Sequence, residues 1–175
     1  MPAVTDDELR DTYRGTIDAL YGYISRRCGG DRQLAEDITQ DTWLRAVRAW
    51  HCKGLPREPV AWLKTVARNL LSNQFRTAQP VALDGVSPEH LLTALDDGRA
   101  HESAEVAVVL NRALARLPRD QTELIEAFHY ERHKVAQIAQ TFGISERAVE
   151  GRLRRARENL RKELETALGA DGALR

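Results

Sequence analysis

Apolar residues recur every three to four positions along most of this 175-residue chain, a spacing that predicts amphipathic helices. No segment shows the alternating Val, Ile, Thr and Tyr pattern of strands, and helix-favouring Ala, Leu, Arg and Glu dominate. The periodic stretches form two blocks, residues 5–78 and 106–168, separated by an irregular stretch at 79–105. We therefore expect an all-α protein with two small helical domains joined by a linker.

The first block contains a predicted helix at residues 31–50, capped near Asp31, that has two apolar sides. One side carries the regular stripe expected of a core-facing surface. Leu44 and Val47 form a second apolar strip among acidic and amide side chains. Such a strip is typical of a partner-binding surface, although packing in a small bundle explains the same pattern.

A Gly- and Pro-containing segment, residues 51–59, is predicted to be a loop, and another helix follows it. We expect Trp62, Val66 and Leu70 to face the core on that helix. Its polar side gathers three hydrogen-bonding side chains: Asn69, Asn73 and Arg76. Two asparagines one turn apart can bind the edge of a base, but without further context an ordinary surface position is the simpler interpretation.

The stretch 79–105 has the composition of an acidic linker. It contains two prolines, two glycines and six acidic residues against a single base, Arg99. Ser87 followed by Pro88 allows a short helix at 88–95. The whole chain has 26 acidic and 26 basic residues, so its neutral total hides a linker of one sign and a C-terminal helix of the other.

A helix-turn-helix is predicted in the last block, at "KVAQIAQTFGISERAVEGRLRRARENL". Gly143 suits a left-handed backbone at the end of the first helix, and Ser145 is a good N-cap for the second. Before this motif, one helix is expected to end at Leu117 and another to begin near Asp120, separated by Pro118. A short Gly-containing turn between two helices is typical of DNA-binding proteins.

The second helix of the motif has one apolar stripe, from Val149 to Leu160, and basic residues outside it. The outward positions are Arg147, Gly151, Arg154 and Glu158, flanked by Glu150, Arg155 and Arg161. Arginine can bind a guanine edge bidentately and can also anchor phosphates. A solvated charged face is the alternative. A glycine inside a helix lowers the stability of the helix by about 1 kcal/mol relative to Ala. Gly151 therefore either allows the backbone to approach DNA closely or is merely tolerated.

Three stretches together resemble bacterial RNA polymerase sigma factors of the extracytoplasmic-function (ECF) group, in the sigma-70 family. They read "AEDITQDTWLRAVRAW", "PVAWLKTVARNLLSNQFR" and "LARLPRDQTELIEAFHYERHKVAQIAQTFGISERAVEGRLRRARENL". Their order and spacing extend over roughly residues 9 to 165. The loop before the second stretch is also similar to the iron-starvation subgroup of this family. A helix-turn-helix alone would indicate only binding to duplex DNA.

The resemblance implies a role for each block. Residues 5–78 would be sigma region 2, which binds core polymerase and the −10 element, and residues 106–168 would be sigma region 4, which reads the −35 element. The implied polymerase-binding residues are Asp37, Gln40, Asp41, Leu44 and Arg45. Those for −10 DNA are Asn69, Asn73 and Arg76. Those for −35 DNA are Ser145, Arg147, Glu150, Gly151, Arg152, Arg154 and Arg155.

The same resemblance implies the partners. They are core RNA polymerase, bound at the clamp helices of its largest subunit and at its flap, promoter DNA, and an anti-sigma factor. It implies no cofactor, no metal and no catalytic residue. A stand-alone helix-turn-helix regulator is the alternative function, but it would leave the first block unexplained and no clear dimerisation helix is evident.

An enzyme is not indicated. His129 and His133 have a spacing that two zinc ligands can use, but Tyr130 stands where a HExxH motif needs Glu, and no third ligand is evident. Cys28 and Cys52 are expected to be reduced thiols without a metal spacing. The acidic N-terminus is not a signal peptide, and no apolar run approaches the roughly 20 residues needed to span a bilayer. We therefore expect a cytoplasmic protein.

Overall fold

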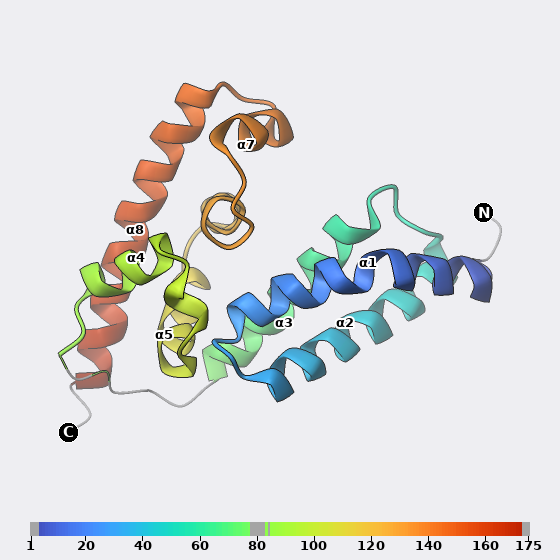
Figure 1. Ribbon diagram of the computed structural model, residues 1–175, viewed down its shortest axis with the longest axis horizontal. Helices are drawn as coiled ribbons and strands as arrows, with labels where there is room; N and C mark the ends of the chain where they lie inside the picture. Colours follow the sequence, from blue (N-terminus) through green and yellow to red (C-terminus); the bar gives the residue numbers. More distant parts are fainter. Residues whose placement is uncertain (1–3, 78–82, 84, 173–175) are drawn as a thin grey trace.

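The computed structural model describes residues 4–77, 83 and 85–172, and within these ranges the regular structure is entirely helical. An all-α fold was expected and is confirmed. The helices lie in two groups, with α1, α2 and α3 side by side in one and the remaining helices in the other (Figure 1). In chain order they are α1 (Asp6–Arg27), α2 (Arg32–Lys53), α3 (Pro59–Thr77), α4 (Pro88–Asp96), η1 (Arg99–His101), α5 (Ala104–Leu114), α6 (Arg119–Ile125), the π-helical turn η2 (Glu126–Tyr130), α7 (Val135–Phe142) and α8 (Glu146–Gly172).

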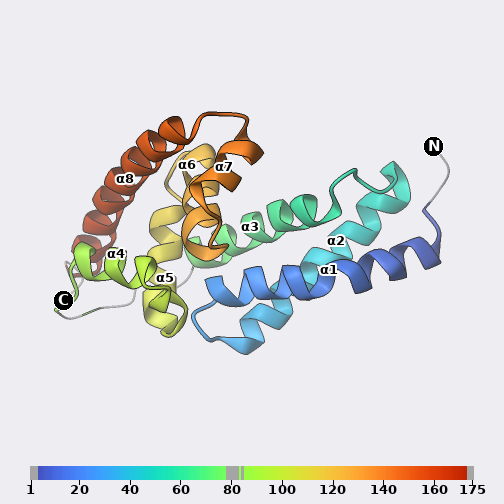
Figure 2. The same cartoon turned by 45° about the horizontal axis from the view of Figure 1, so that its top comes forward.

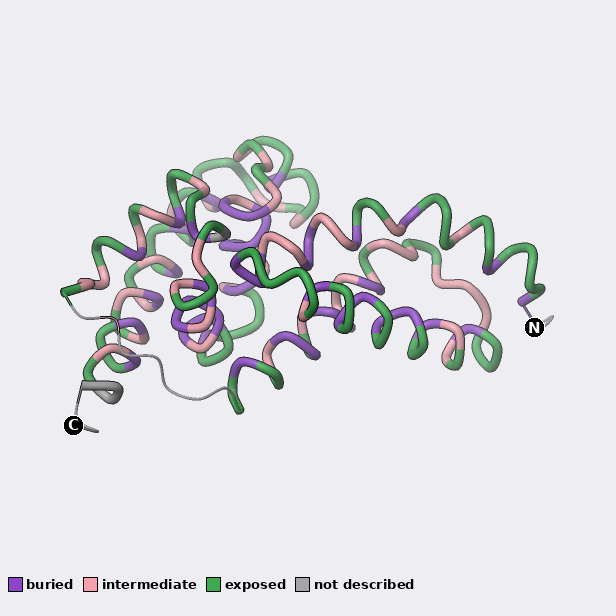
Figure 3. Tube along the Cα trace, turned by 60° about the horizontal axis from the view of Figure 1, so that its bottom comes forward, coloured by how far each residue is buried: buried purple, intermediate pink, exposed green. Residues whose placement is uncertain are grey.

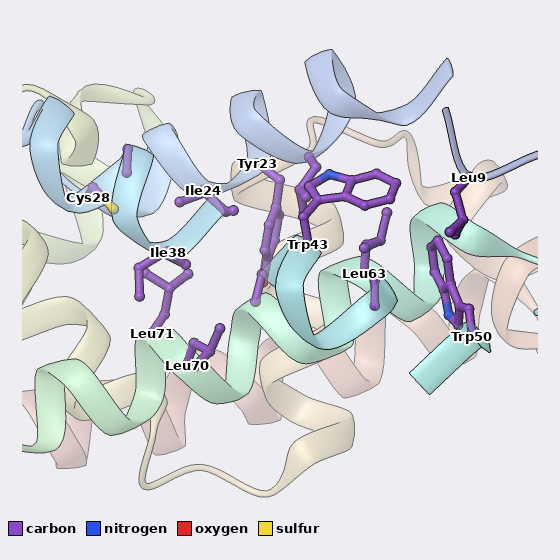
Figure 4. Packing of buried hydrophobic residues seen from close by; sticks show 14 of the residues in the cluster. Leu9, Tyr23, Ile24, Cys28, Ile38, Trp43, Trp50, Leu63, Leu70 and Leu71 are labelled. Atoms are coloured by element: carbon purple, nitrogen blue, oxygen red, sulfur yellow. The ribbon is translucent and has the colours of Figure 1, made fainter. Parts of the chain in front are cut away.

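The first three helices enclose one core. Large apolar side chains from all three meet between them, among them Tyr23, Trp43 and Leu71 (Figure 4). The helices begin where their caps predict. Thr5 and Glu8 form a capping box at the start of α1, and Asp31 accepts a hydrogen bond from the Leu34 backbone at the start of α2 (2.9 Å).

Two expectations for this part of the chain were wrong in detail. The predicted loop at 51–59 is shorter, because α2 continues through Lys53 and ends at Gly54, whose positive φ of 83° turns the chain. The core stripe of α3 is also rotated: Leu63 and Ala67 are fully buried, whereas Trp62 is half-buried at the edge of the core. Apolar residues stand on both sides of this helix, so their spacing does not fix which side faces inward.

The remaining helices surround two further cores. One joins α4, α5 and the C-terminal part of α8, and the other joins α6, α7 and the beginning of α8. The short helix expected at 88–95 is confirmed as α4, capped by Ser87. Its Leu91 and Leu95 are completely or almost completely buried in the first of these cores. The later part of the expected linker, 79–105, is therefore packed structure, while residues 79–82 and 84 lie outside the described residues.

The helix-turn-helix forms as predicted from α7 and α8. Gly143 adopts the left-handed conformation (φ 64°, ψ 35°) at the end of α7. The Ser145 hydroxyl accepts a hydrogen bond from the Ala148 backbone (3.2 Å) and caps α8. Buried and exposed residues alternate along α8 with the helical period, so that one side packs inward and the other faces solvent (Figure 3). The buried side is the predicted stripe, Val149, Leu153, Ala156 and Leu160.

Candidate nucleic-acid and partner interfaces

The outer side of α8 is a basic surface near its N-terminus. Of the predicted −35 residues, Ser145 caps the helix and the others lie on its first three turns. Gly151 is half-buried, and the other six are exposed: Ser145, Arg147, Glu150, Arg152, Arg154 and Arg155. Two hollows flank this part of the helix, one lined by Arg154 and Val135 and the other by Arg152, Arg155 and Gln121. The arginines therefore fan out on both sides of the exposed face, as a helix in a major groove requires.

The arginines of α8 divide into free and paired groups. Arg157 forms a bidentate ion pair with Asp96 of α4, in which Arg157 Nη2 lies 2.8 Å from Asp96 Oδ2. Arg161 pairs with Glu158 (2.8 Å) and Glu165 (2.6 Å) on the same helix. Among the described residues, none of the four arginines nearer the start of the helix has an ion-pair partner within 4.0 Å: Arg147, Arg152, Arg154 and Arg155. Positive charge therefore remains available where a DNA-reading helix needs it.

Gly151 occupies a position that the fold does not reserve for glycine. A Cβ atom placed there would meet no atom within 4 Å outside its own helical backbone. The half-buried backbone is thus open on this side, and internal packing offers no reason for the absence of a side chain. This observation excludes a packing requirement for glycine at this position.

A second polar surface lies on α3. Asn69, Asn73 and Arg76 are all exposed, and Arg76 donates a hydrogen bond to the Asn73 side chain (3.3 Å). The three predicted −10 residues therefore share one side of the helix, opposite the core. Their amide and guanidinium groups have the donors and acceptors needed to bind unpaired base edges.

A third surface is apolar and lies between α1 and α2. A hollow of about 590 Å³ is lined by Gln40, Leu44, Tyr13 and Trp43, among others. Leu44 is 54% exposed and Tyr13 is 45% exposed, and no other large apolar residue in the described chain is classed as exposed. An exposed apolar hollow with polar edges is typical of a protein-binding site.

The structure places the five predicted polymerase-binding residues unequally around this hollow. Gln40 and Leu44 line it, whereas the exposed Asp37, Asp41 and Arg45 lie outside it on the same helix. Analysis of the sequence missed Tyr13, because it gave no helix face to residues before 31. The Tyr13 ring packs on Trp43, with ring centroids 5.0 Å apart, so α1 supplies one wall of the hollow.

The two histidines considered as zinc ligands do not share a helix face. His129 belongs to η2 and is buried, whereas His133 follows that turn and its side chain is 41% exposed. His129 is therefore part of the packing between η2 and α4, and His133 is a partly exposed residue. In the described part of the chain no group of three or more His, Cys, Asp or Glu side chains is arranged to hold a metal.

The cysteines also differ in their surroundings. Burial raises the pKa of the Cys28 thiol to about 12, which leaves it protonated, while Cys52 is exposed on α2. No helix in the described ranges combines the length and apolar character needed to cross a membrane.

The described residues form an all-helical fold with a helix-turn-helix, which is typical of DNA-binding transcription factors. Residues 12–81 match the family model of Sigma-70 region 2, and residues 107–160 match that of Sigma-70, region 4. The chain belongs to the ECF RNA polymerase sigma factors of the sigma-70 family. This membership confirms the expectation of a sigma factor that directs promoter-specific transcription initiation and is not an enzyme.

Individual relatives agree with this assignment. The ECF RNA polymerase sigma factor SigL of Mycobacterium tuberculosis is 34% identical over 165 residues, which cover 90% of this chain and 89% of SigL. The ECF RNA polymerase sigma factor BldN of Streptomyces coelicolor is 32% identical over 150 residues, covering 82% of this chain and 55% of BldN. A probable RNA polymerase sigma factor, RfaY of Xanthomonas campestris, is 29% identical over 156 residues, covering 86% of this chain and 38% of RfaY.

Proposed function

We propose that the chain binds core RNA polymerase through the α1–α2 hollow and the neighbouring exposed residues of α2, and then reads two promoter elements. The observation that carries this proposal is the presence of regions 2 and 4 in one chain, each with its own exposed polar or basic helix. The clamp helices of the largest subunit would bind the hollow, and the polymerase flap would bind region 4. Such a protein works in the cytoplasm, where polymerase and chromosome are found.

The two DNA-facing helices suit two states of promoter DNA. The free arginines of α8 suit duplex DNA at −35, because a helix in the major groove reads base edges with arginine and binds phosphates on both sides. The amides of α3 suit melted DNA at −10, where bases are unstacked and their edges are accessible. By binding the melted strand, α3 would hold the −10 region open.

In-vitro transcription with core polymerase tests this function directly. Purified protein and core polymerase are incubated with fragmented genomic DNA, and the start sites of the transcripts are mapped. We expect starts that share two sequence elements and that disappear without the protein. Tight, sequence-specific binding of the free protein to duplex DNA, with no effect on polymerase, would instead indicate a stand-alone regulator.

We also propose that an anti-sigma factor holds the chain inactive and that the chain belongs to the iron-starvation subgroup. The first follows from the family and the second from the segment "REPVAWL" at residues 57–63, which joins the end of the loop to the beginning of α3. Affinity capture of the tagged protein from its own cells, with and without iron limitation, tests both. We expect a partner that is lost when iron is scarce, together with the appearance of the mapped transcripts.

A further inference from the structure

A helix of the expected linker packs against the DNA-reading helix. α4 lies beside α8 (Figure 2), and its Leu91 shares a core with Ala156 and Leu160 of that helix. α4 lies outside residues 107–160, which match the family model of region 4. The contact therefore adds to the DNA-reading part of this chain an element that the family model does not include.

The last residue of α4, Asp96, binds the side chain of Arg157. The two side chains form a bidentate pair, in which Arg157 Nη2 lies 2.8 Å from Asp96 Oδ2. Arg157 Nη1 also lies 3.2 Å from Nε2 of the buried His129, which accepts its hydrogen bond because arginine has donors only. The guanidinium of Arg157 thus has two partners, and a carboxylate from outside α8 compensates its charge.

The backbone of Asp96 is attached to the segment before α7. Arg132, which precedes α7, donates a hydrogen bond from Nη1 to the Asp96 carbonyl (2.8 Å). Arg132 has a φ of 58°, a conformation that residues other than glycine rarely adopt. A Cβ atom at Gly98 would overlap the end of the Arg132 side chain, so glycine leaves room for it. The end of α4 is therefore held both before α7 and on α8, which fixes Asp96 beside Arg157.

Arg157 lies at a height on α8 that suits a phosphate contact rather than a base contact. It comes about three helical turns after Glu146, the first residue of α8, or about 16 Å along the helix at 5.4 Å per turn. The major groove is about 12 Å wide, so a side chain this far along a helix that enters the groove lies near its edge, where the phosphates are. Arg157 also lines the same hollow as Arg154, one turn before it. An unpaired arginine at this position could therefore bind a phosphate.

The pair with Asp96 removes most of the gain from such a contact. Each phosphate that a free arginine neutralises releases counterions, and log K then falls more steeply with log salt by about 0.9. Arg157 would have to give up a carboxylate to take a phosphate, so it would exchange one anionic partner for another. The Asp96 carboxylate would then be unpaired beside the negatively charged DNA backbone.

We propose that Asp96 is a positioning residue for DNA binding by region 4, and that it holds Arg157 away from the phosphate backbone. Region 4 then binds DNA with the unpaired arginines in the first three turns of α8. The linker helix thereby sets the affinity and the salt dependence of region 4 for DNA of any sequence. Its role in −35 binding rests on the proposed function, whereas the salt dependence can be measured on any duplex.

Charge removal at Asp96 tests this role in the full-length protein. Asp96→Asn keeps the size of the side chain and one accepting oxygen, but it removes the charge that compensates Arg157. Fluorescence anisotropy with a short labelled duplex of scrambled sequence measures the affinity at several KCl concentrations. We expect a salt slope that is steeper by about 0.9 and, at the lowest salt concentration, an affinity about three- to tenfold higher.

Two further variants show whether Arg157 causes the change. Arg157→Gln alone should keep the wild-type slope, because the paired arginine makes no phosphate contact. In the double variant Asp96→Asn/Arg157→Gln the slope should return to the wild-type value, since the released guanidinium is absent.

Asp97→Asn is the matched control for net charge. Asp97 is the neighbouring residue, and it pairs with Arg99 (2.7 Å) instead of with α8. The substitution removes the same charge one position further along the chain, so it should leave the slope close to that of the wild type.

The outcomes separate this role from the proposed function. A slope that falls by about 0.9 in Arg157→Gln would show that Arg157 binds a phosphate despite Asp96, and this overturns the inference. Equal slopes for Asp96→Asn and the wild type overturn it as well. The Arg157→Gln measurement decides the question even if Asp96→Asn does not fold. If the slopes change as expected but the holoenzyme uses no promoter, the proposed function fails and the role of Asp96 stands.

Discussion

Individual arginines of α8 are distinguished by their partners rather than by their number. Arg157 is held by Asp96, and Arg161 is held by Glu158 and Glu165, so their charges are compensated within the protein. Arg154 and Arg155 are exposed and have no ion-pair partner among the described residues. Only such uncompensated side chains can contribute fully to binding a base edge or a phosphate.

Replacement of one free arginine should therefore weaken use of the −35 element. We expect Arg154→Ala or Arg155→Ala to cost about 1–3 kcal/mol for each base contact that is lost. In-vitro transcription from promoters with single substitutions in the −35 element measures both strength and selectivity. Arg161→Ala, which breaks only pairs within the helix, should change neither. Unchanged −35 selectivity in both test variants contradicts the assigned face.

Leu44 provides the corresponding test for polymerase binding. It is 54% exposed, so Leu44→Ala should have little effect on folding but should remove apolar area from the hollow. We expect a weaker affinity for core polymerase, by about 1–2 kcal/mol, and an equal loss at every promoter. Fluorescence anisotropy of labelled protein with core polymerase measures the affinity. Lys162→Ala, exposed on α8, is the control, and a promoter-selective defect of Leu44→Ala would assign the residue to DNA instead.

At the scale of the element, the π-helical turn η2 gives His129 an unusual environment. Burial lowers the pKa of His129 to about 4; Asp96, 3.2 Å away, opposes this effect, whereas Arg157 and Arg132 add to it. The folded protein therefore holds this imidazole neutral, while the unfolded chain binds a proton near pH 6.5. Folding stability should fall as the pH drops from about 6.5 to about 4.

Urea denaturation between pH 7 and pH 4 measures that effect. The neutral histidine should account for a loss of up to about 3 kcal/mol across this range. His129→Gln cannot titrate, so its stability should depend less on pH than that of the wild type. His133→Gln is the matched control, because His133 is partly exposed, and it should behave like the wild type. Equal pH profiles for wild type and His129→Gln would show that His129 titrates normally in the folded protein.

Sequence periodicity predicted the elements that have one apolar side. On α8 the apolar residues Val149, Leu153 and Leu160 share one side, which predicts that this side packs against the core, and the structure confirms that orientation. On α3 the same reasoning selected Trp62 instead of Leu63, since apolar residues on both sides leave the helix rotation undecided. The π-helical turn was also beyond prediction, because its i→i+5 hydrogen bonds depart from the 3.6-residue period on which the prediction rests.

At the scale of the whole molecule, contacts between the domains could not be predicted from the sequence. Arg27 of α1 and Glu126 of η2 form a buried ion pair between the domains although they are 99 positions apart, and neither belongs to a motif that identifies its partner. The separate domains could be inferred because each has its own periodic helices and its own apolar residues. Their contact also includes Val108 of α5, which packs against the core of α1–α3, and the close fit of Gly29, in the turn between α1 and α2, against the beginning of α5. Only the folded surfaces reveal these contacts.

The buried contact of Arg27, at the end of α1, with Asn111 of α5 and Glu126 of η2 should make the two domains unfold together. Asn111 is completely buried and forms hydrogen bonds with both the side chain and the backbone of Arg27. The substitution Asn111→Ala leaves Nε and the carbonyl group of Arg27 without this partner, at a cost of about 1–3 kcal/mol each. Because most of that cost falls on the docked state, we expect the single calorimetric transition of the wild type to separate into two.

Asn159→Ala is the matched control for this measurement. Asn159 also forms a side-chain hydrogen bond, to Gln121 (2.9 Å), but both residues belong to region 4. Its loss should lower the melting temperature without separating the transitions, because it acts inside one domain. If Asn111→Ala also melts in a single step, the domains are coupled by more than the contact around Arg27, and the buried ion pair is not what holds them together.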